Sequence, residues 1–126
     1  MTEEKYKILL VEDDKFLADI YTTKFTHEGF DVLNVGDGAM VLEKAKVYKP
    51  DLVMLDLVLP NMDGWEVFEA LRNDEETKNL KVVVFSNLDS QEDYEKAKKF
   101  SAIGYIVKAK NTPKDVVEKI KELINK

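Results

Sequence analysis

The chain has no cysteine, so disulfide bonds, thiolate metal sites and cysteine nucleophiles are excluded. It has no apolar run near the ~20 residues that cross a bilayer, and its start, MTEEKYK, lacks the apolar core of a signal peptide. Positively charged residues are fewer than negatively charged ones, with 19 Lys and Arg compared with 25 Asp and Glu. The net charge of -6 argues against direct binding to nucleic acid phosphates. We therefore expect a cytoplasmic protein without a membrane partner or a direct nucleic acid partner.

Glycine-rich loops and repeats are also missing. No glycine-rich loop follows an apolar run, which argues against a nucleotide-binding enzyme. No internal repeat, low-complexity segment or linker divides the chain. With 126 residues, of which 44% are hydrophobic and 35% charged, the chain is typical of a globular domain that buries a core. We expect residues 1–126 to form one domain.

Short apolar runs alternate with longer stretches in which apolar residues recur at helical spacing, and this alternation indicates βαβ units. The runs are apolar at successive positions, which is typical of parallel strands covered on both faces. We expect five strands and five helices. The clearest strands are residues 8–11, 52–55, 82–85 and 105–107. The helical stripes are Leu17, Ile20, Tyr21 and Phe25; Val41, Leu42, Ala45 and Tyr48; Val67, Phe68 and Leu71; Tyr94, Ala97 and Phe100; and Val116, Val117, Ile120, Leu123 and Ile124.

Polar side chains follow four of these runs at the point where each strand ends. Glu12 and Asp13 follow the first run, and Asp56 follows the run LVML. Ser86 follows VVVF, and Lys108 follows YIV. The carboxyl ends of parallel strands share one edge, which is the edge where open α/β sheets bind ligands. Three carboxylates, a hydroxyl and an ammonium should therefore converge, and the acids would repel one another unless a cation or proton intervenes.

The segment DLVLPNMDG, residues 56–64, is the most specific stretch of the sequence. Together with the polar residues after the strands, it closely resembles the receiver domain of bacterial two-component response regulators, in its stand-alone, chemotaxis-regulator-like form. The resemblance spans the whole chain. It implies a doubly wound (βα)5 flavodoxin-like fold with a five-stranded parallel sheet in the order 2-1-3-4-5.

The resemblance also implies roles for individual residues. Asp56 looks like the phosphoryl-accepting aspartate, with Lys108 and Ser86 acting beside it. Ser86 and Tyr105 match the pair that switches when the phosphoryl group arrives. Such a domain phosphorylates and dephosphorylates itself but is not otherwise an enzyme.

A magnesium ion is the implied cofactor. Magnesium prefers oxygen ligands in an octahedron and keeps some of its waters. Asp13, Asp56 and the carbonyl of Val58 would supply the protein ligands, and Glu12 would act through water. No other cofactor is expected.

The implied partners are proteins. The donor would be a histidine kinase or a histidine phosphotransfer protein, docking near the first helix and the Asp56 edge. The downstream partner would bind the face built from the fourth helix, the fifth strand and the fifth helix.

Several alternatives compete with this interpretation. A haloacid-dehalogenase-type phosphatase needs a second Asp two residues after the first, where this chain has Val58. A flavodoxin-type electron carrier needs a phosphate loop after the first strand, where this chain has acids. A degenerate receiver that binds partners without phosphorylation stays open, because Ala109 replaces the proline usual after Lys108 and Asn87 replaces a small residue. A cis bond before alanine costs about 2.5 to 4 kcal/mol, so we expect Ala109 to follow a trans bond.

Overall fold

The computed structural model describes residues 4–125, which form five strands, five α-helices and two short 3-10 helices. The strands are β1 (Lys7–Val11), β2 (Asp31–Val35), β3 (Leu52–Leu55), β4 (Lys81–Ser86) and β5 (Gly104–Val107). The helices are α1 (Lys15–His27), η1 (Gly38–Met40), α2 (Val41–Tyr48), α3 (Gly64–Asn73), α4 (Gln91–Lys99), η2 (Lys108–Lys110) and α5 (Pro113–Ile124).

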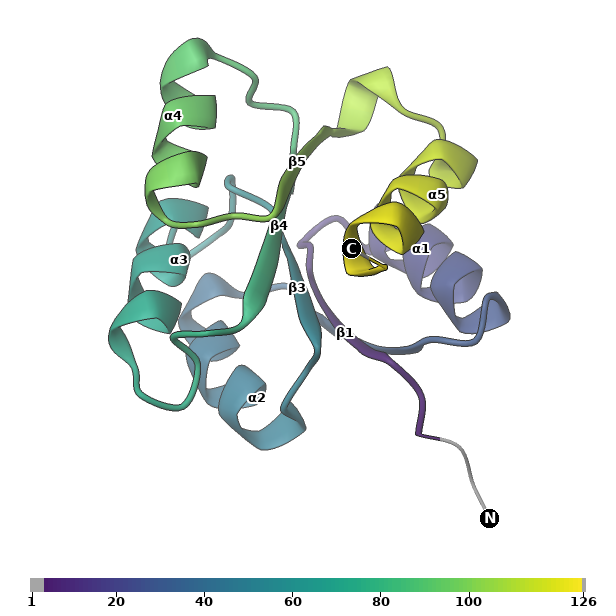
Figure 1. The fold of residues 1–126 in the computed structure, drawn as a ribbon, viewed down its shortest axis with the longest axis horizontal. Coiled ribbons are helices and arrows are strands. Elements are labelled where there is room, and N and C mark those ends of the chain that lie inside the picture. The colour runs from purple at the N-terminus through teal and green to yellow at the C-terminus, as the bar shows by residue number, and fades with distance from the viewer. Residues whose placement is uncertain (1–3, 126) are drawn as a thin grey trace.

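The five strands are parallel and lie in the order β2-β1-β3-β4-β5, which confirms the predicted topology. Helices α1 and α5 cover one face of the sheet, and α2, α3 and α4 cover the other (Figure 1). Alternate strand residues point to opposite faces. Ile8 and Leu10 accordingly pack in the core under α1 and α5, whereas Leu9 and Val11 pack in the core under α2 and α3. This two-sided burial explains why the strands are apolar at successive positions.

Side-chain caps fix where the helices begin. The Asp63 carboxylate accepts a hydrogen bond from the Glu66 amide at the start of α3. The Thr112 hydroxyl and the Asp115 carboxylate form a reciprocal capping box at α5. Asp14 caps α1. These caps satisfy amides that would otherwise have no partner in the first turn.

One glycine lets α3 begin directly beside the loop that follows β3. A Cβ atom at Gly64 would collide with the backbone of Asp56 and Leu57. The Gly64 amide donates to the Leu57 carbonyl at 3.0 Å. Asn61 adopts a left-handed conformation with φ of 66°, which completes the tight turn. The segment DLVLPNMDG therefore folds back sharply and leaves Asp56 at the end of its strand.

A cluster of hydrogen bonds around Arg72 closes the opposite end of the sheet, where β4 begins. The guanidinium donates to four backbone carbonyls, at 2.7 Å to Phe100, 3.0 Å to Lys78, 2.8 Å to Leu80 and 3.3 Å to Ser101. Burial lowers the pKa of Arg72, although a guanidinium stays charged at any physiological pH. Arg72 thus joins α3, the loop before β4 and the end of α4.

Candidate functional site

Three carboxylates meet at the carboxyl edge of the sheet. One oxygen from each of Glu12, Asp13 and Asp56 lies within 4.8 Å of the others. Glu12 is 2% exposed and Asp56 is 4% exposed, whereas Asp13 is exposed to solvent. The Glu12 amide donates to the Val35 carbonyl at 3.1 Å, and the Asp56 amide donates to the Val11 carbonyl at 3.2 Å. The strand ladders therefore extend one residue further and fix both buried acids.

Lys108 brings the only ammonium that bonds to this cluster among residues 4–125. Its Nζ lies 2.9 Å from Asp56 Oδ2 and also donates to Glu12 Oε1. The Lys108 side chain is only 12% exposed, and its Nζ lies 5.3 Å from the centre of the Phe85 ring. Burial by itself lowers the pKa of Lys108, but the hydrogen bonds to Glu12 and Asp56 outweigh burial, so the pKa lies above its ordinary value. Lys108 is therefore held as a cation.

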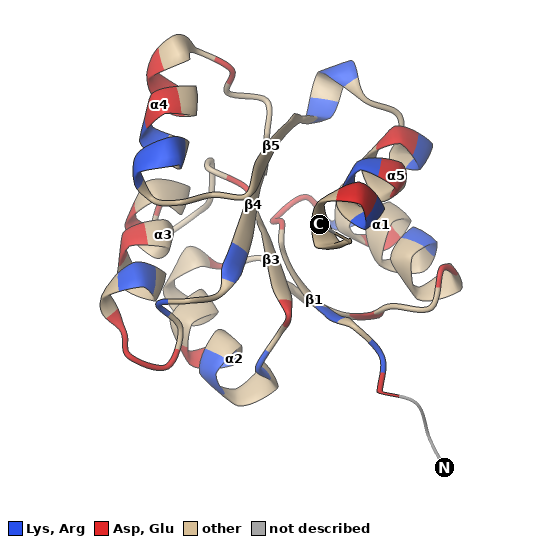
Figure 2. Cartoon of the chain, viewed as in Figure 1, with Lys and Arg blue, Asp and Glu red and all other residues tan. Residues whose placement is uncertain are grey.

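The pKa of Glu12 is shifted by the same surroundings. Burial raises the pKa of Glu12, and hydrogen bonds from the Lys108 ammonium and the Asp14 amide only partly oppose this rise. The Asp14 amide lies 3.1 Å from Glu12 Oε2. When all groups are ionised, three carboxylates against one ammonium leave two negative charges at this edge. Figure 2 shows the acidic turn where β1 leads into α1 and the basic residues of η2. The excess charge and the oxygen donors fit a hard divalent cation.

Ser86, the hydroxyl residue predicted for the site, lies at the end of the neighbouring strand β4. Ser86 is fully buried, and its Oγ accepts a weak hydrogen bond from the Leu88 amide at 3.4 Å. Because β3 and β4 are adjacent and parallel, Ser86 lies at the same edge as Asp56. Tyr105, one strand further, donates its hydroxyl to the Leu88 carbonyl and packs its ring 4.4 Å from that of Tyr94. Burial raises the pKa of Tyr105, so its hydroxyl stays protonated as a donor.

Val58 lies in the loop that leaves Asp56. Its amide donates to Asp56 Oδ1 at 3.2 Å, so both carboxylate oxygens of Asp56 have partners. The Val58 side chain is 60% exposed. Apart from Tyr105, which lies within β5, each residue that the sequence predicted for the site therefore lies at the carboxyl edge or in a loop that leaves it.

Two asparagine side chains bond to the backbone around Lys108, and neither bond was predicted from the sequence. Asn87 Oδ1 accepts from the Ala109 amide at 2.7 Å, and Asn111 Nδ2 donates to the Val107 carbonyl at 2.8 Å. The size of Asn87, where a small residue is usual, was the only sequence signal. Residues 4–125 contain no cis peptide bond, which confirms the trans bond expected before Ala109.

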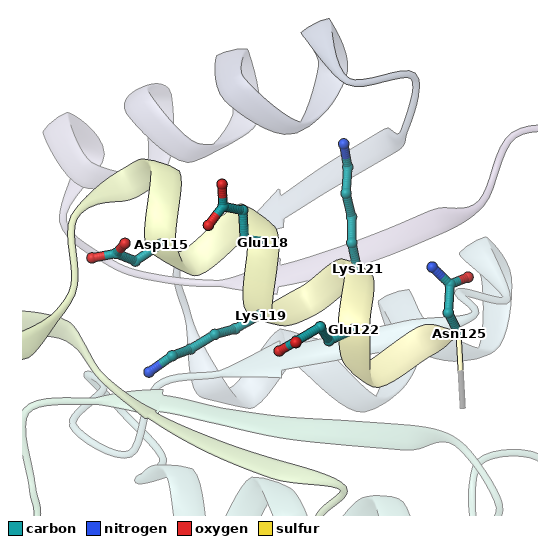
Figure 3. Close-up of a pocket in the computed structure, with 6 residues that line it drawn as sticks. All are labelled: Asp115, Glu118, Lys119, Lys121, Glu122 and Asn125. Carbon is teal, nitrogen blue, oxygen red and sulfur yellow. The ribbon is translucent and has the colours of Figure 1, made fainter.

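A separate hollow runs along the charged side of α5 (Figure 3). None of the predicted site residues lines it; its lining residues are Asp115, Glu118, Lys119, Lys121, Glu122 and Asn125. Lys121 reaches Glu28 after α1 in an ion pair. The alternating charges on α5 are mutually compensating, so this hollow offers no concentrated charge of one sign.

No helix within residues 4–125 combines the length and the apolar character needed to cross a membrane.

The open parallel sheet, with acids and a lysine at its carboxyl edge, has the architecture of a signalling receiver domain. Residues 8–121 match the family model described as the response regulator receiver domain. The chain belongs to this family.

Individual relatives agree with this assignment. The chain is 43% identical over 74 residues to the DNA-binding response regulator MtrA of Mycolicibacterium smegmatis, covering 59% of this chain and 32% of that protein. The matched part of the chain thus spans about a third of the length of such curated relatives. A CheY-like response regulator receiver domain protein from Methanospirillum hungatei JF-1 superposes with a TM-score of 0.87 at 27% identity, covering 97% of this chain and 95% of that one. The phosphorylated cyanobacterial phytochrome response regulator RcpA has a TM-score of 0.73 at 29% identity, covering 82% and 81%.

Proposed function

We propose that the chain is a magnesium-dependent phosphoryl acceptor and that Asp56 carries the phosphoryl group. The observation that supports this proposal best is the position of the Asp56 carboxylate, which is buried at the ligand-binding edge, 2.9 Å from the Lys108 ammonium and beside two further acids. A carboxylate can act as a nucleophile toward phosphorus and form an acyl phosphate. One relative of known structure is named as a phosphorylated response regulator.

The proposed reaction transfers a phosphoryl group from a phosphohistidine donor. An Asp56 oxygen forms the new bond to phosphorus, and the bond from phosphorus to the donor's imidazole nitrogen breaks. The electron pair of the broken bond stays on the imidazole, which takes a proton from solvent. The Lys108 ammonium would move from the carboxylate to the phosphoryl oxygens as negative charge develops on them. A positioned positive charge of this kind is the main contribution a protein makes to phosphoryl transfer.

The metal ligands in this proposal are Asp13, Asp56 and the carbonyl of Val58, with Glu12 acting through a water. The hard oxygen donors and the excess of two negative charges fit magnesium. When bound, magnesium would neutralise charge on the phosphoryl oxygens. The chain's own residues orient the acceptor, because the Val58 amide and Lys108 each bond to one Asp56 oxygen.

The signal would leave the site through Ser86 and Tyr105. Phosphoryl oxygens at Asp56 offer new acceptors to the Ser86 hydroxyl, whose only present partner among the described residues is the weakly bonded Leu88 amide. Movement of that hydroxyl would free space for the Tyr105 ring and bias a two-state equilibrium. The altered face would be α4-β5-α5, where the downstream protein binds. Residues 1–126 would form one receiver domain that takes its phosphoryl group from a histidine kinase or a histidine phosphotransfer protein.

Intact mass after incubation with acetyl phosphate and magnesium tests the proposal. The parent should gain one phosphoryl group, Asp56→Asn should gain none, and Asp13→Asn should gain it slowly because it lacks a metal ligand. The control is Asp19→Asn, which changes an exposed acid on α1. Equal phosphorylation of the parent and Asp56→Asn would refute the assignment. A folded parent that gains nothing would favour a degenerate receiver that binds partners without phosphorylation.

A further inference from the structure

The turn that carries Lys108 is weakly held by its own backbone. It is the three-residue helix η2, and no side chain caps its N-terminal end. The backbone bond at its C-terminal end, from the Asn111 amide to the Lys108 carbonyl, is long at 3.4 Å. Short 3-10 turns have poor hydrogen-bond geometry and little stability of their own. Something else must therefore fix the Cα atom from which Lys108 reaches the acids.

Two side-chain amides hold the peptide groups on either side of that Cα atom. The peptide group before Lys108 is held at its Val107 carbonyl by Asn111, only four residues along the chain. The peptide group after Lys108 is held at its Ala109 amide by Asn87, which lies 22 residues away in the loop after β4. The Asn87 bond, at 2.7 Å, is the shorter of the two. It is also the bond that ties the turn to another strand end.

We propose that Asn87 is a positioning residue for Lys108. The inference rests on the proposed role of Lys108 in phosphoryl transfer. A lysine ammonium stands on a flexible stem with four carbons, so its position depends on the backbone that carries it. By anchoring Ala109, Asn87 keeps the Lys108 ammonium within bonding distance of Asp56 and Glu12.

The bond also joins two parts of the proposed switch. Asn87 directly follows Ser86, and Ala109 directly follows Lys108. The loop after β4 and the turn after β5 are therefore linked next to the hydroxyl and next to the ammonium that would contact the phosphoryl group. An exposed ion pair between Lys110 and Asp89, at 3.1 Å, spans the same two segments, but surface pairs of this kind contribute little.

The test compares Asn87→Ala with the parent by NMR and by phosphorylation kinetics. In Asn87→Ala the Ala109 amide proton should move upfield and exchange faster with solvent, and the Lys108 side-chain nitrogen signal should shift. Phosphorylation by acetyl phosphate should slow about threefold to tenfold, which is the range expected for losing one hydrogen bond that supports the reacting geometry. Asn87→Asp, which keeps an acceptor oxygen, should restore the Ala109 amide signal and most of the rate. Asn79→Ala, an exposed asparagine at the other end of β4, is the matched control.

The outcomes separate this inference from the proposed function. A Lys108 signal that is unchanged in Asn87→Ala would overturn the inference, whether or not the parent accepts a phosphoryl group. A rate equal to that of the parent would also overturn it, and a faster rate would show that Asn87 obstructs the donor instead. If the parent accepts no phosphoryl group, the proposed function fails. The Lys108 side-chain nitrogen signal alone then tests whether Asn87 positions Lys108.

Discussion

Replacing Lys108 with methionine should destabilise the protein strongly when no divalent metal is present. The Lys108 ammonium lies 2.9 Å from Asp56 and also bonds to Glu12, and both of these acids are buried. Methionine keeps an unbranched apolar stem beside Phe85 but removes the charge. The change leaves the carboxylates of Glu12, Asp13 and Asp56 facing one another without a cation.

The size of the effect follows from the distances. Two carboxylates whose oxygens lie within 4.8 Å of each other repel by at least about 3.5 kcal/mol at an effective dielectric constant of about 20, and the attraction lost across 2.9 Å is about 5.7 kcal/mol. Removing Lys108 also removes the cost of desolvating its ammonium, so part of this gross loss cancels. Removing one partner of a buried ion pair costs ~3 to 5 kcal/mol, and the solvent exposure of Asp13, the third acid of the cluster, favours the lower end. A loss of about 3 kcal/mol corresponds to a fall in Tm of roughly 12 °C for a domain of this size.

Thermal and urea unfolding in EDTA measure the loss. The control is Lys44→Met, because Lys44 is an exposed lysine on α2 for which we find no ion pair among residues 4–125. Saturating magnesium should recover part of the loss, since a cation bound to the native acids replaces some of the missing charge. A Lys108→Met protein that is as stable as Lys44→Met in EDTA would refute the reasoning, because the acids would then not need Lys108 for compensation.

Three further predictions concern the signal, the lifetime of the phosphoryl group and pH. Ser86→Ala should still be phosphorylated, but the amide NMR shifts around Tyr105 should then no longer change on phosphorylation; shifts like those of the parent would contradict the switch. Replacing Val58 with Asn and Leu88 with Glu should shorten the phosphorylated lifetime, because polar side chains can orient an attacking water and apolar ones cannot; equal decay in a folded double variant would contradict this. Burial raises the pKa of Glu12 above 4.5, so the native state binds its proton more tightly than the unfolded state. The metal-free parent should therefore lose stability as pH rises from 4.5 through the folded pKa, and Glu12→Gln should flatten that loss in urea unfolding.

The sheet and the convergence of the site were predictable because both follow from strand ends. Val11 and Leu55 end buried parallel strands, so the acids that follow them had to share an edge. The helix starts at Asp63 and Thr112 were also predictable, since a cap acts within three residues of itself. The topological order came from the family resemblance, because local patterns do not say which strands are neighbours.

The bonds between loops were not predictable. The bond from Ala109 to Asn87 depends on how two loops from different strands approach each other, and no periodic pattern encodes that approach. The same is true of Arg72, which reads in the sequence as an ordinary helix-surface arginine. The direct bond between Lys108 and Glu12 was also missed, since the sequence indicates only that their strand ends share an edge.

The two ends of the sheet tolerate substitution differently, because the four bonds made by Arg72 at one end are of another kind than the bonds at the other end. All four acceptors are backbone carbonyls, which every amino acid carries, so residues 78, 80 and 100 can change their side chains without removing a partner. Ser101 is more restricted, because its φ of 63° disfavours β-branched residues. At the carboxyl edge the bonds of Lys108 to Asp56 and Glu12 instead join two side chains, and each needs both residues. One end of the molecule therefore depends on a single arginine around which other side chains can change, whereas at the other end Lys108, Asp56 and Glu12 depend on one another.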